Sequence, residues 1–142
     1  MRIDGRCHCG YLSFEAEADL EQVSICHCTD CQTGSGTAFR TSIRAAGNSF
    51  KLRSGEPTRY LKTTADSGNP RVQAFCPTCG TPIYSTSPGD NPDAYMIRTG
   101  TLRQRDQLVP RQQNWFRSAR PWVTELASIP RNEKGRPSKP TS

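Results

Sequence analysis

The fold of this chain is decided by the stretch Phe75–Gly80, which reads FCPTCG. Two cysteines with two residues between them, the first of which is proline, and with glycine after them have the form of a zinc knuckle. In a knuckle, a tight turn directs two sulfurs and nearby backbone N–H groups towards one metal ion. A knuckle supplies only two ligands, whereas a structural zinc ion takes four. The chain must therefore supply a second pair.

Cys7 and Cys9 are predicted to be that second pair. In an extended strand, residues i and i+2 project from the same face, so their sulfurs can share one ion. The three remaining cysteines of the seven are Cys26, Cys28 and Cys31, which we place at a strand end and in the turn that follows. Three thiolates leave one position of a zinc ion open. The sequence predicts two zinc ions per chain, one in a closed four-cysteine site and one in an open three-cysteine site.

Two histidines, His8 and His27, each lie between two cysteines. The alternation that brings the flanking sulfurs together turns the histidine to the opposite face, so neither is a predicted ligand. His8 is expected to be partly exposed or hydrogen-bonded. For His27, a role beside the open site as a proton carrier stays open.

Other uses of the cysteines were weighed against zinc. The N-terminus has no signal peptide and no stretch reaches about 20 apolar residues, so we expect a cytoplasmic protein without a membrane span, in which thiols stay reduced. A disulfide framework is therefore disfavoured. A thioredoxin-like redox pair at Cys76 and Cys79 would precede a long helix, which Gly80–Pro82 does not suggest. One zinc site with three spare thiols is the remaining alternative.

The apolar pattern predicts a single, mainly β domain with short helical turns. Leu12, Phe14 and Ala16 alternate with polar residues on one strand. Further strands are expected at 50–53, 59–63, 83–85 and 95–99, and one or two helical turns at 29–33. Residues 1–129 form the predicted domain, and residues 130–142 form a basic polar tail.

The net charge of +6 does not indicate a nucleic-acid partner. The segment 131–140 holds four basic residues and one acidic residue, so the folded part is only mildly basic. A further basic segment contains five arginines that either form a solvated face or receive the carboxylates of a glutathione-like ligand. These are Arg103, Arg105, Arg111, Arg117 and Arg120. The nearby Trp115, Phe116 and Trp122 are predicted to be packing residues.

Taken together, these motifs resemble the glutathione-dependent formaldehyde-activating enzyme family, also called the centromere protein V-like (CENP-V-like) domain. The matching elements are Cys7–Gly10, Cys26–Cys31 with Gly36 and Phe39, Phe75–Tyr84, Gly100–Leu102 and Pro121–Trp122. The resemblance implies an Mss4-like zinc-binding β-sheet fold. It also implies structural zinc at Cys7, Cys9, Cys76 and Cys79, and catalytic or substrate-binding zinc at Cys26, Cys28 and Cys31. The chain departs from the family pattern at Arg103, where many members have aspartate, and at Gln113 or Asn114, where many have histidine.

The open site favours thiol chemistry. Three anionic ligands make zinc a weaker Lewis acid, so holding a substrate thiolate suits this site better than activating water. With the resemblance, this predicts a carbon–sulfur lyase resembling S-(hydroxymethyl)glutathione synthase, which joins a small thiol such as glutathione to an aldehyde or cleaves the adduct. The alternative is a non-catalytic zinc-binding module that contacts protein or nucleic acid through its basic C-terminal region.

Overall fold

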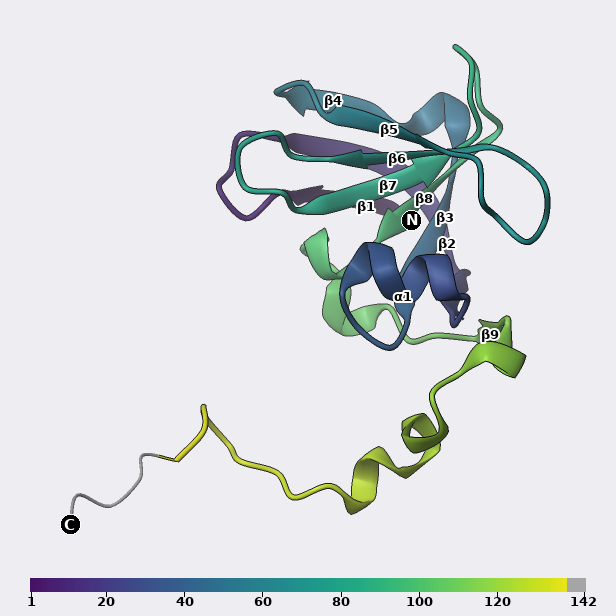
Figure 1. Cartoon of the computed structure of the whole chain (residues 1–142). Helices are drawn as coiled ribbons and strands as arrows, with labels where there is room; N and C mark the ends of the chain where they lie inside the picture. The colour runs from purple at the N-terminus through teal and green to yellow at the C-terminus, as the bar shows by residue number, and fades with distance from the viewer. Residues whose placement is uncertain (138–142) are drawn as a thin grey trace.

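The computed structural model describes residues 1–137 and has the predicted mainly β architecture (Figure 1). Its strands pair in the order β1-β2-β3-β8-β7-β6-β5, and β4 and β9 also pair with β2. All pairings are antiparallel except that of β2 with β9. The strands are β1 (Arg2–Arg6), β2 (Ser13–Cys26), β3 (Arg40–Ala46), β4 (Lys51–Ser54), β5 (Thr58–Lys62), β6 (Arg71–Phe75), β7 (Pro82–Thr86), β8 (Ala94–Arg98) and β9 (Gln112–Asn114).

The helices of residues 1–137 are short. The α-helix α1 (Thr29–Ser35) lies at the end of β2, as Figure 1 shows, and covers the predicted helical turns with two residues more. It ends at Gly36, whose left-handed φ of 71° suits a residue without a side chain. The 3-10 helices are η1 (Gly47–Ser49), η2 (Thr99–Thr101), η3 (Arg105–Gln107), η4 (Phe116–Ser118) and η5 (Pro121–Ser128).

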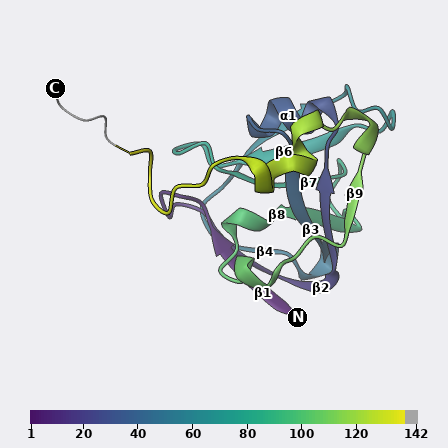
Figure 2. The same ribbon diagram turned by 90° about the horizontal axis from the view of Figure 1, so that it is seen from below.

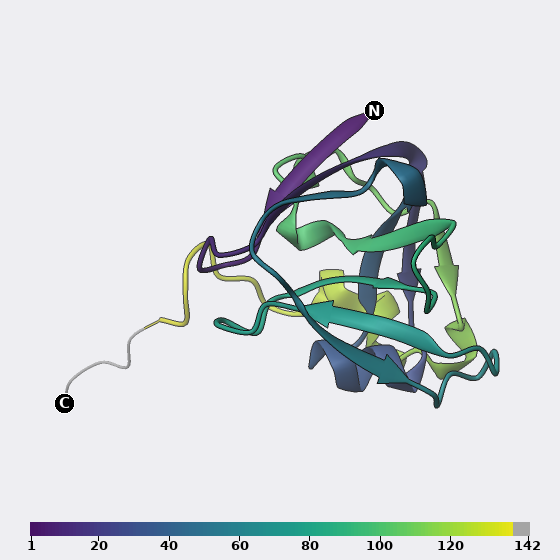
Figure 3. The ribbon, with the colours of Figure 1, turned by 90° about the horizontal axis from the view of Figure 1, so that it is seen from above.

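The long strand β2 connects the two halves of the structure. Its first half pairs with β1 and β4, and its second half pairs with β3 and β9. The register shifts between Ala18 and Val23, and such an irregularity lets a strand bend from one sheet into another. Figure 2 shows β9 beside the second half of β2, and Figure 3 shows β1 and β5 on opposite sides of the molecule.

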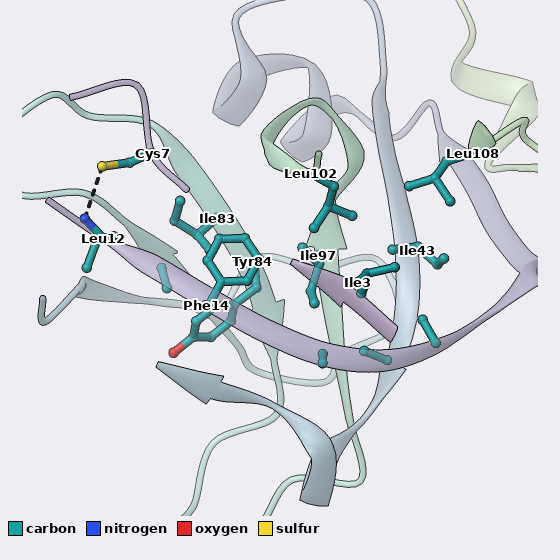
Figure 4. Packing of buried hydrophobic residues seen from close by; sticks show 14 of the residues in the cluster. Ile3, Cys7, Leu12, Phe14, Ile43, Ile83, Tyr84, Ile97, Leu102 and Leu108 are labelled. Carbon is teal, nitrogen blue, oxygen red and sulfur yellow. Dashed lines mark hydrogen bonds between the residues drawn. The ribbon is translucent and has the colours of Figure 1, made fainter. Parts of the chain in front are cut away.

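The core lies between the part of the sheet that contains β1 and β4 and the part that contains β3, β7 and β8. Leu12, Phe14 and Ala16 are buried, as their alternation predicted, and they pack with Ile3, Ile97 and other apolar residues of β1, β3, β7 and β8 (Figure 4). Burial of an apolar side chain of this size contributes about 1.5–3 kcal/mol. The core therefore fixes β2 and the segments at and next to its two ends. Five of the seven cysteines lie in these segments: Cys7, Cys9, Cys26, Cys28 and Cys31.

Strands expected near residues 50–53, 59–63, 83–85 and 95–99 are confirmed as β4, β5, β7 and β8. The sequence did not predict β1, β3, β6, β9 or the second half of β2. In β3 and β6 the face opposite the core carries arginine, serine and glutamine, which obscures the apolar alternation. Strand β9 has no buried residue at all.

After β9 the chain runs away from the strands, below α1 in the view of Figure 1. Helix η5 exposes Trp122 and Leu126, and residues 130–137 contain no helix or strand. Residues 138–142 of the predicted tail lie outside the described part of the chain. Among the described residues, no helix is long and apolar enough to cross a membrane.

Candidate metal centres

Four cysteines from two distant turns meet in one cluster. The turn Cys7–Gly10 follows β1, the turn Cys76–Gly80 joins β6 to β7, and the four Sγ atoms lie within 4.8 Å of one another. The Sγ of Cys9 is 3.6 Å from that of Cys7 and 3.8 Å from that of Cys76. Four sulfurs about 2.3 Å from a tetrahedral zinc ion lie about 3.8 Å apart, so this cluster, defined here as the four-cysteine site, fits zinc.

The pair Cys7 and Cys9 does not lie on an extended strand, and this part of the prediction is wrong. Cys7 follows the last residue of β1, and the Gly10 N–H donates to the Cys7 carbonyl at 3.2 Å to close a turn. Gly10 has a φ of 85° and Gly80, after the other pair, has a φ of 76°. Each second cysteine is thus followed by a glycine in the left-handed conformation, which lets the chain reverse. Two facing knuckles form the site.

Backbone and side-chain donors surround the sulfurs of Cys7, Cys76 and Cys79. The Leu12 N–H donates to Cys7 Sγ at 3.2 Å (Figure 4), and the Thr78 N–H donates to Cys76 Sγ at 3.4 Å. The hydrogen bond between the Thr81 hydroxyl and Cys79 Sγ, 3.1 Å long, lowers the pKa of the Cys79 thiol to about 5. Donors placed around a sulfur stabilise its anionic form, which is the form that binds metal.

The other three cysteines form a second cluster at the junction of β2 and α1. Cys26 ends β2, Cys28 caps the N-terminus of α1 by accepting from the Cys31 N–H at 3.3 Å, and Cys31 lies in the first turn of the helix. Their Sγ atoms lie within 4.8 Å of one another, and no His, Cys, Asp or Glu from the rest of residues 1–137 joins them. The hydrogen bond with Cys31 lowers the pKa of the Cys26 thiol. This three-cysteine site can hold a metal ion and leave one position free.

A cavity of about 210 Å³ adjoins the three-cysteine site. Its lining residues come from one face of β2, β3, β6, β7 and β8, from the 62–67 segment and from β9. Beside the three cysteines they include Arg40, Ser42, Arg71, Gln73, Ser85, Arg98 and Trp115. Of the cavity residues just named beyond the cysteines, only Trp115 was a candidate from the sequence. Their positions in the sequence offered one sign of this arrangement. Residues i and i+2 of a strand share a face, so Arg40 lies on the same face as Ser42, and Arg71 on the same face as Gln73.

Comparison with known proteins shows the family of this chain and a solved structure with the same fold. The family model described as glutathione-dependent formaldehyde-activating enzyme matches residues 2–118. The chain belongs to the glutathione-dependent formaldehyde-activating enzyme family. The crystal structure of a Rhodobacter sphaeroides protein has the same fold, with a TM-score of 0.60 and 22% sequence identity over 78% of this chain and 99% of that one. No curated protein matches the chain.

His27 of this chain is buried, and a residue of β9 holds its ring. Its Nε2 lies 2.8 Å from the Gln113 Oε1, and because an amide oxygen accepts, Nε2 carries the proton. The ring packs edge-on against Phe39 and Phe116, at centroid distances of 5.5 and 5.3 Å. The Nδ1 is buried without a partner among the described residues. His27 thus joins β9 and η4 to the three-cysteine site, whereas His8 is exposed.

The predicted arginine segment lies away from the cavity. Arg103, Arg105, Arg111, Arg117 and Arg120 are all exposed, and none of them lines the cavity. Arg103, the other departure from the family pattern, pairs with Asp4 at 2.9 Å, and Arg117 lies over the Trp115 ring at 5.2 Å. The basic groups beside the cysteines are instead the strand arginines Arg40, Arg71 and Arg98.

Proposed function

We propose that both cysteine clusters bind zinc and that the three-cysteine site joins a small thiol to an aldehyde, or cleaves the adduct. The observation that carries this proposal is the arrangement of three sulfurs within 4.8 Å, without a fourth ligand from residues 1–137, at the wall of a cavity. Structural zinc sites are closed by four protein ligands, and sites with three are those that accept a substrate.

The chemistry follows from the donor set. Zinc bound by Cys26, Cys28 and Cys31 would lower the pKa of an incoming thiol, which would release its proton to water. The thiol sulfur forms a bond to the aldehyde carbon, the carbonyl π electrons move to oxygen, and that oxygen takes back one proton from water, so that no proton is gained or lost overall. The guanidinium groups of Arg40 and Arg98 line the same cavity and can stabilise the developing oxyanion. Cleavage is the reverse of this step.

The proposed partner is a small thiol or its aldehyde adduct, and we place the protein in the cytoplasm, where thiols stay reduced. The family membership supports the proposed thiol and the proposed aldehyde, since the matching model is described as glutathione-dependent and formaldehyde-activating. The four-cysteine site is given a structural role because it joins two turns 67 residues apart in sequence, from Cys9 to Cys76.

The test is catalysis above the spontaneous reaction. Zinc-loaded protein is added to thiol and formaldehyde at equilibrium, and the exchange rate between free thiol and hydroxymethyl adduct is measured by NMR exchange spectroscopy. We expect a rate that rises with protein concentration for the parent and falls to background for Cys28→Ser. Arg53→Gln, which changes an exposed arginine outside the cavity, should retain the parent rate.

A parent rate equal to the background would refute the catalytic proposal. Salt-dependent nucleic-acid binding that persists after removal of residues 130–142 would then favour a non-catalytic binding module.

A further inference from the structure

Three arginines beside the three-cysteine site have no carboxylate partner in the part of the chain that the structure describes. Arg40, Arg71 and Arg98 all line the 210 Å³ cavity. Within residues 1–137, none of them has a carboxylate oxygen within 4.0 Å. Lys62, on the same cavity wall, is paired with Asp30 at 3.5 Å. Partly buried guanidinium groups are normally paired with an anion, so the lining of this cavity suits an anionic ligand.

Arg40 and Arg98 are held close together by one amide oxygen. Gln73 Oε1 accepts from Arg98 Nη2 at 2.7 Å and from Arg40 Nη1 at 3.0 Å, while Arg98 Nη1 donates to Ser42 Oγ at 2.7 Å. The Nε atoms of both arginines are buried without an acceptor among the described residues. Two like charges are therefore fixed side by side with unused donors. A carboxylate in the cavity beside them would reduce this repulsion.

The strand pairing places these groups next to the cysteines. Cys26 on β2 lies across from Arg40 on β3, and Ser42 lies across from Arg98 on β8. The opposite faces of β3 and β8 bury Ile43 and Ile97 in the core. Burial lowers the pKa of Arg98 and the charge of Arg40 lowers it further, whereas the sulfurs of Cys31 and Cys26 raise it. The core thus holds two cations in a position that is unfavourable without a counter-ion.

The metal site and the cavity rim do not account for all of this positive charge. A zinc ion with the three cysteine thiolates and the thiolate of a bound ligand would carry a charge of −2 and would offset two guanidinium groups. Asp66 also lines the cavity, but within residues 1–137 no ion pair joins it to any of the three arginines. One of the three arginine charges still has no counterpart, which matches a single carboxylate on the ligand.

We infer that Arg40, Arg71 and Arg98 bind the carboxylate of a small mercaptocarboxylate whose sulfur occupies the open position of the three-cysteine site. This inference rests on the proposed function and specifies its substrate class. The cavity of about 210 Å³ is smaller than the pockets of about 300–1,000 Å³ that enclose drug-sized ligands, so it favours a small thiol. Mercaptoacetate and its hydroxymethyl adduct are much smaller than a tripeptide thiol.

The test compares two thiols that differ in charge. Isothermal titration calorimetry on the zinc-loaded full chain measures the affinities for mercaptoacetate and for its neutral isostere, 2-mercaptoacetamide. We expect the parent to bind mercaptoacetate about ten- to a hundred-fold more tightly, the range of a charge-assisted hydrogen bond. Arg98→Gln should bring the affinities for the two thiols within about threefold of each other. Arg71→Gln should reduce the ratio of the two affinities by a smaller amount. Arg53 pairs with Glu15 outside the cavity, so Arg53→Gln is the matched control and should leave the ratio of the two affinities unchanged.

Several results would overturn this inference. Equal affinities for the two thiols in the parent would do so, and catalysis with the neutral thiol would then leave the proposed function standing. Tighter binding of glutathione than of mercaptoacetate would refute the size argument, and binding of neither thiol would refute the inference together with the proposed function. If the arginine variants do not fold, acetate competition decides: acetate should weaken binding of mercaptoacetate to the parent, and its failure to do so counts against the inference. Arginine-dependent mercaptoacetate binding without catalysis would support the subsite alone.

Discussion

Replacing one cysteine in each cluster should give opposite outcomes for the fold. Cys79→Ser removes a ligand of the four-cysteine site, and Cys28→Ser removes a ligand of the three-cysteine site. Cys79 is exposed and Cys28 is partly exposed, so neither change empties space in the core. Any large loss of stability must therefore come from the lost metal and not from lost packing.

The magnitudes differ because the two sites hold different parts of the chain. The four-cysteine site joins the turn after β1 to the turn between β6 and β7, and Cys7 and Cys76 belong to the core cluster. A structural zinc contributes about 10–16 kcal/mol in small zinc-dependent domains, while whole domains are stable by about 5–15 kcal/mol. We expect Cys79→Ser to be largely unfolded at 25 °C.

Cys28→Ser should keep the fold. The three-cysteine site is made within the short segment Cys26–Cys31, so its metal does not join distant strands. Cys28 is the N-cap of α1, and serine is a favoured N-cap residue that can accept the same hydrogen bond from the Cys31 N–H. The expected loss is about 1–2 kcal/mol, within the range of about 0.5–3 kcal/mol of most single substitutions.

The assay combines zinc content per chain by mass spectrometry with urea unfolding followed by circular dichroism. The parent should hold close to two zinc ions, and Cys28→Ser should hold one with a cooperative unfolding transition. Similar destabilisation by both changes, or a folded Cys79→Ser chain without its zinc, would refute the division into structural and open sites.

Two further changes test local features of the structure. Gln113→Leu removes the acceptor for the buried Nε2–H of His27, so the free energy of unfolding should fall by about 1–3 kcal/mol in urea titration; no loss would show that His27 finds another partner. Gly47→Ala places a Cβ against the backbone carbonyl of Pro92, so it should lower the melting temperature, whereas Gly100→Ala has open space and should not. Equal melting temperatures for these two variants would contradict the close approach at Gly47.

The sequence predicted the cysteine groups well because metal ligands are local signals. The pairs Cys7 with Cys9 and Cys76 with Cys79 meet as grouped, although a second knuckle, and not a strand, presents the first pair. The glycine after Cys9 was the available sign of a turn. The structural and open roles of the two sites remain predictions until metal content is measured.

The cavity was beyond prediction because it depends on pairing between distant strands. Arg40, Gln73 and Arg98 lie on three different strands, and only the order β3-β8-β7-β6 brings them to one wall. In the sequence they looked like the polar positions of ordinary solvent-facing strands. The arginines that did attract attention, such as Arg103, were clustered in sequence and are exposed in the structure.

The central claim is that the three-cysteine site leaves a metal position that an external thiol fills. X-ray absorption at the zinc edge measures this directly in the zinc-loaded chain. Seven cysteine sulfurs shared by two zinc ions give 3.5 sulfurs per zinc, with lighter atoms completing the open site. Saturating mercaptoacetate should raise the average to four sulfurs and remove the light-atom shell, whereas an unchanged value of 3.5 with that shell intact would contradict the claim.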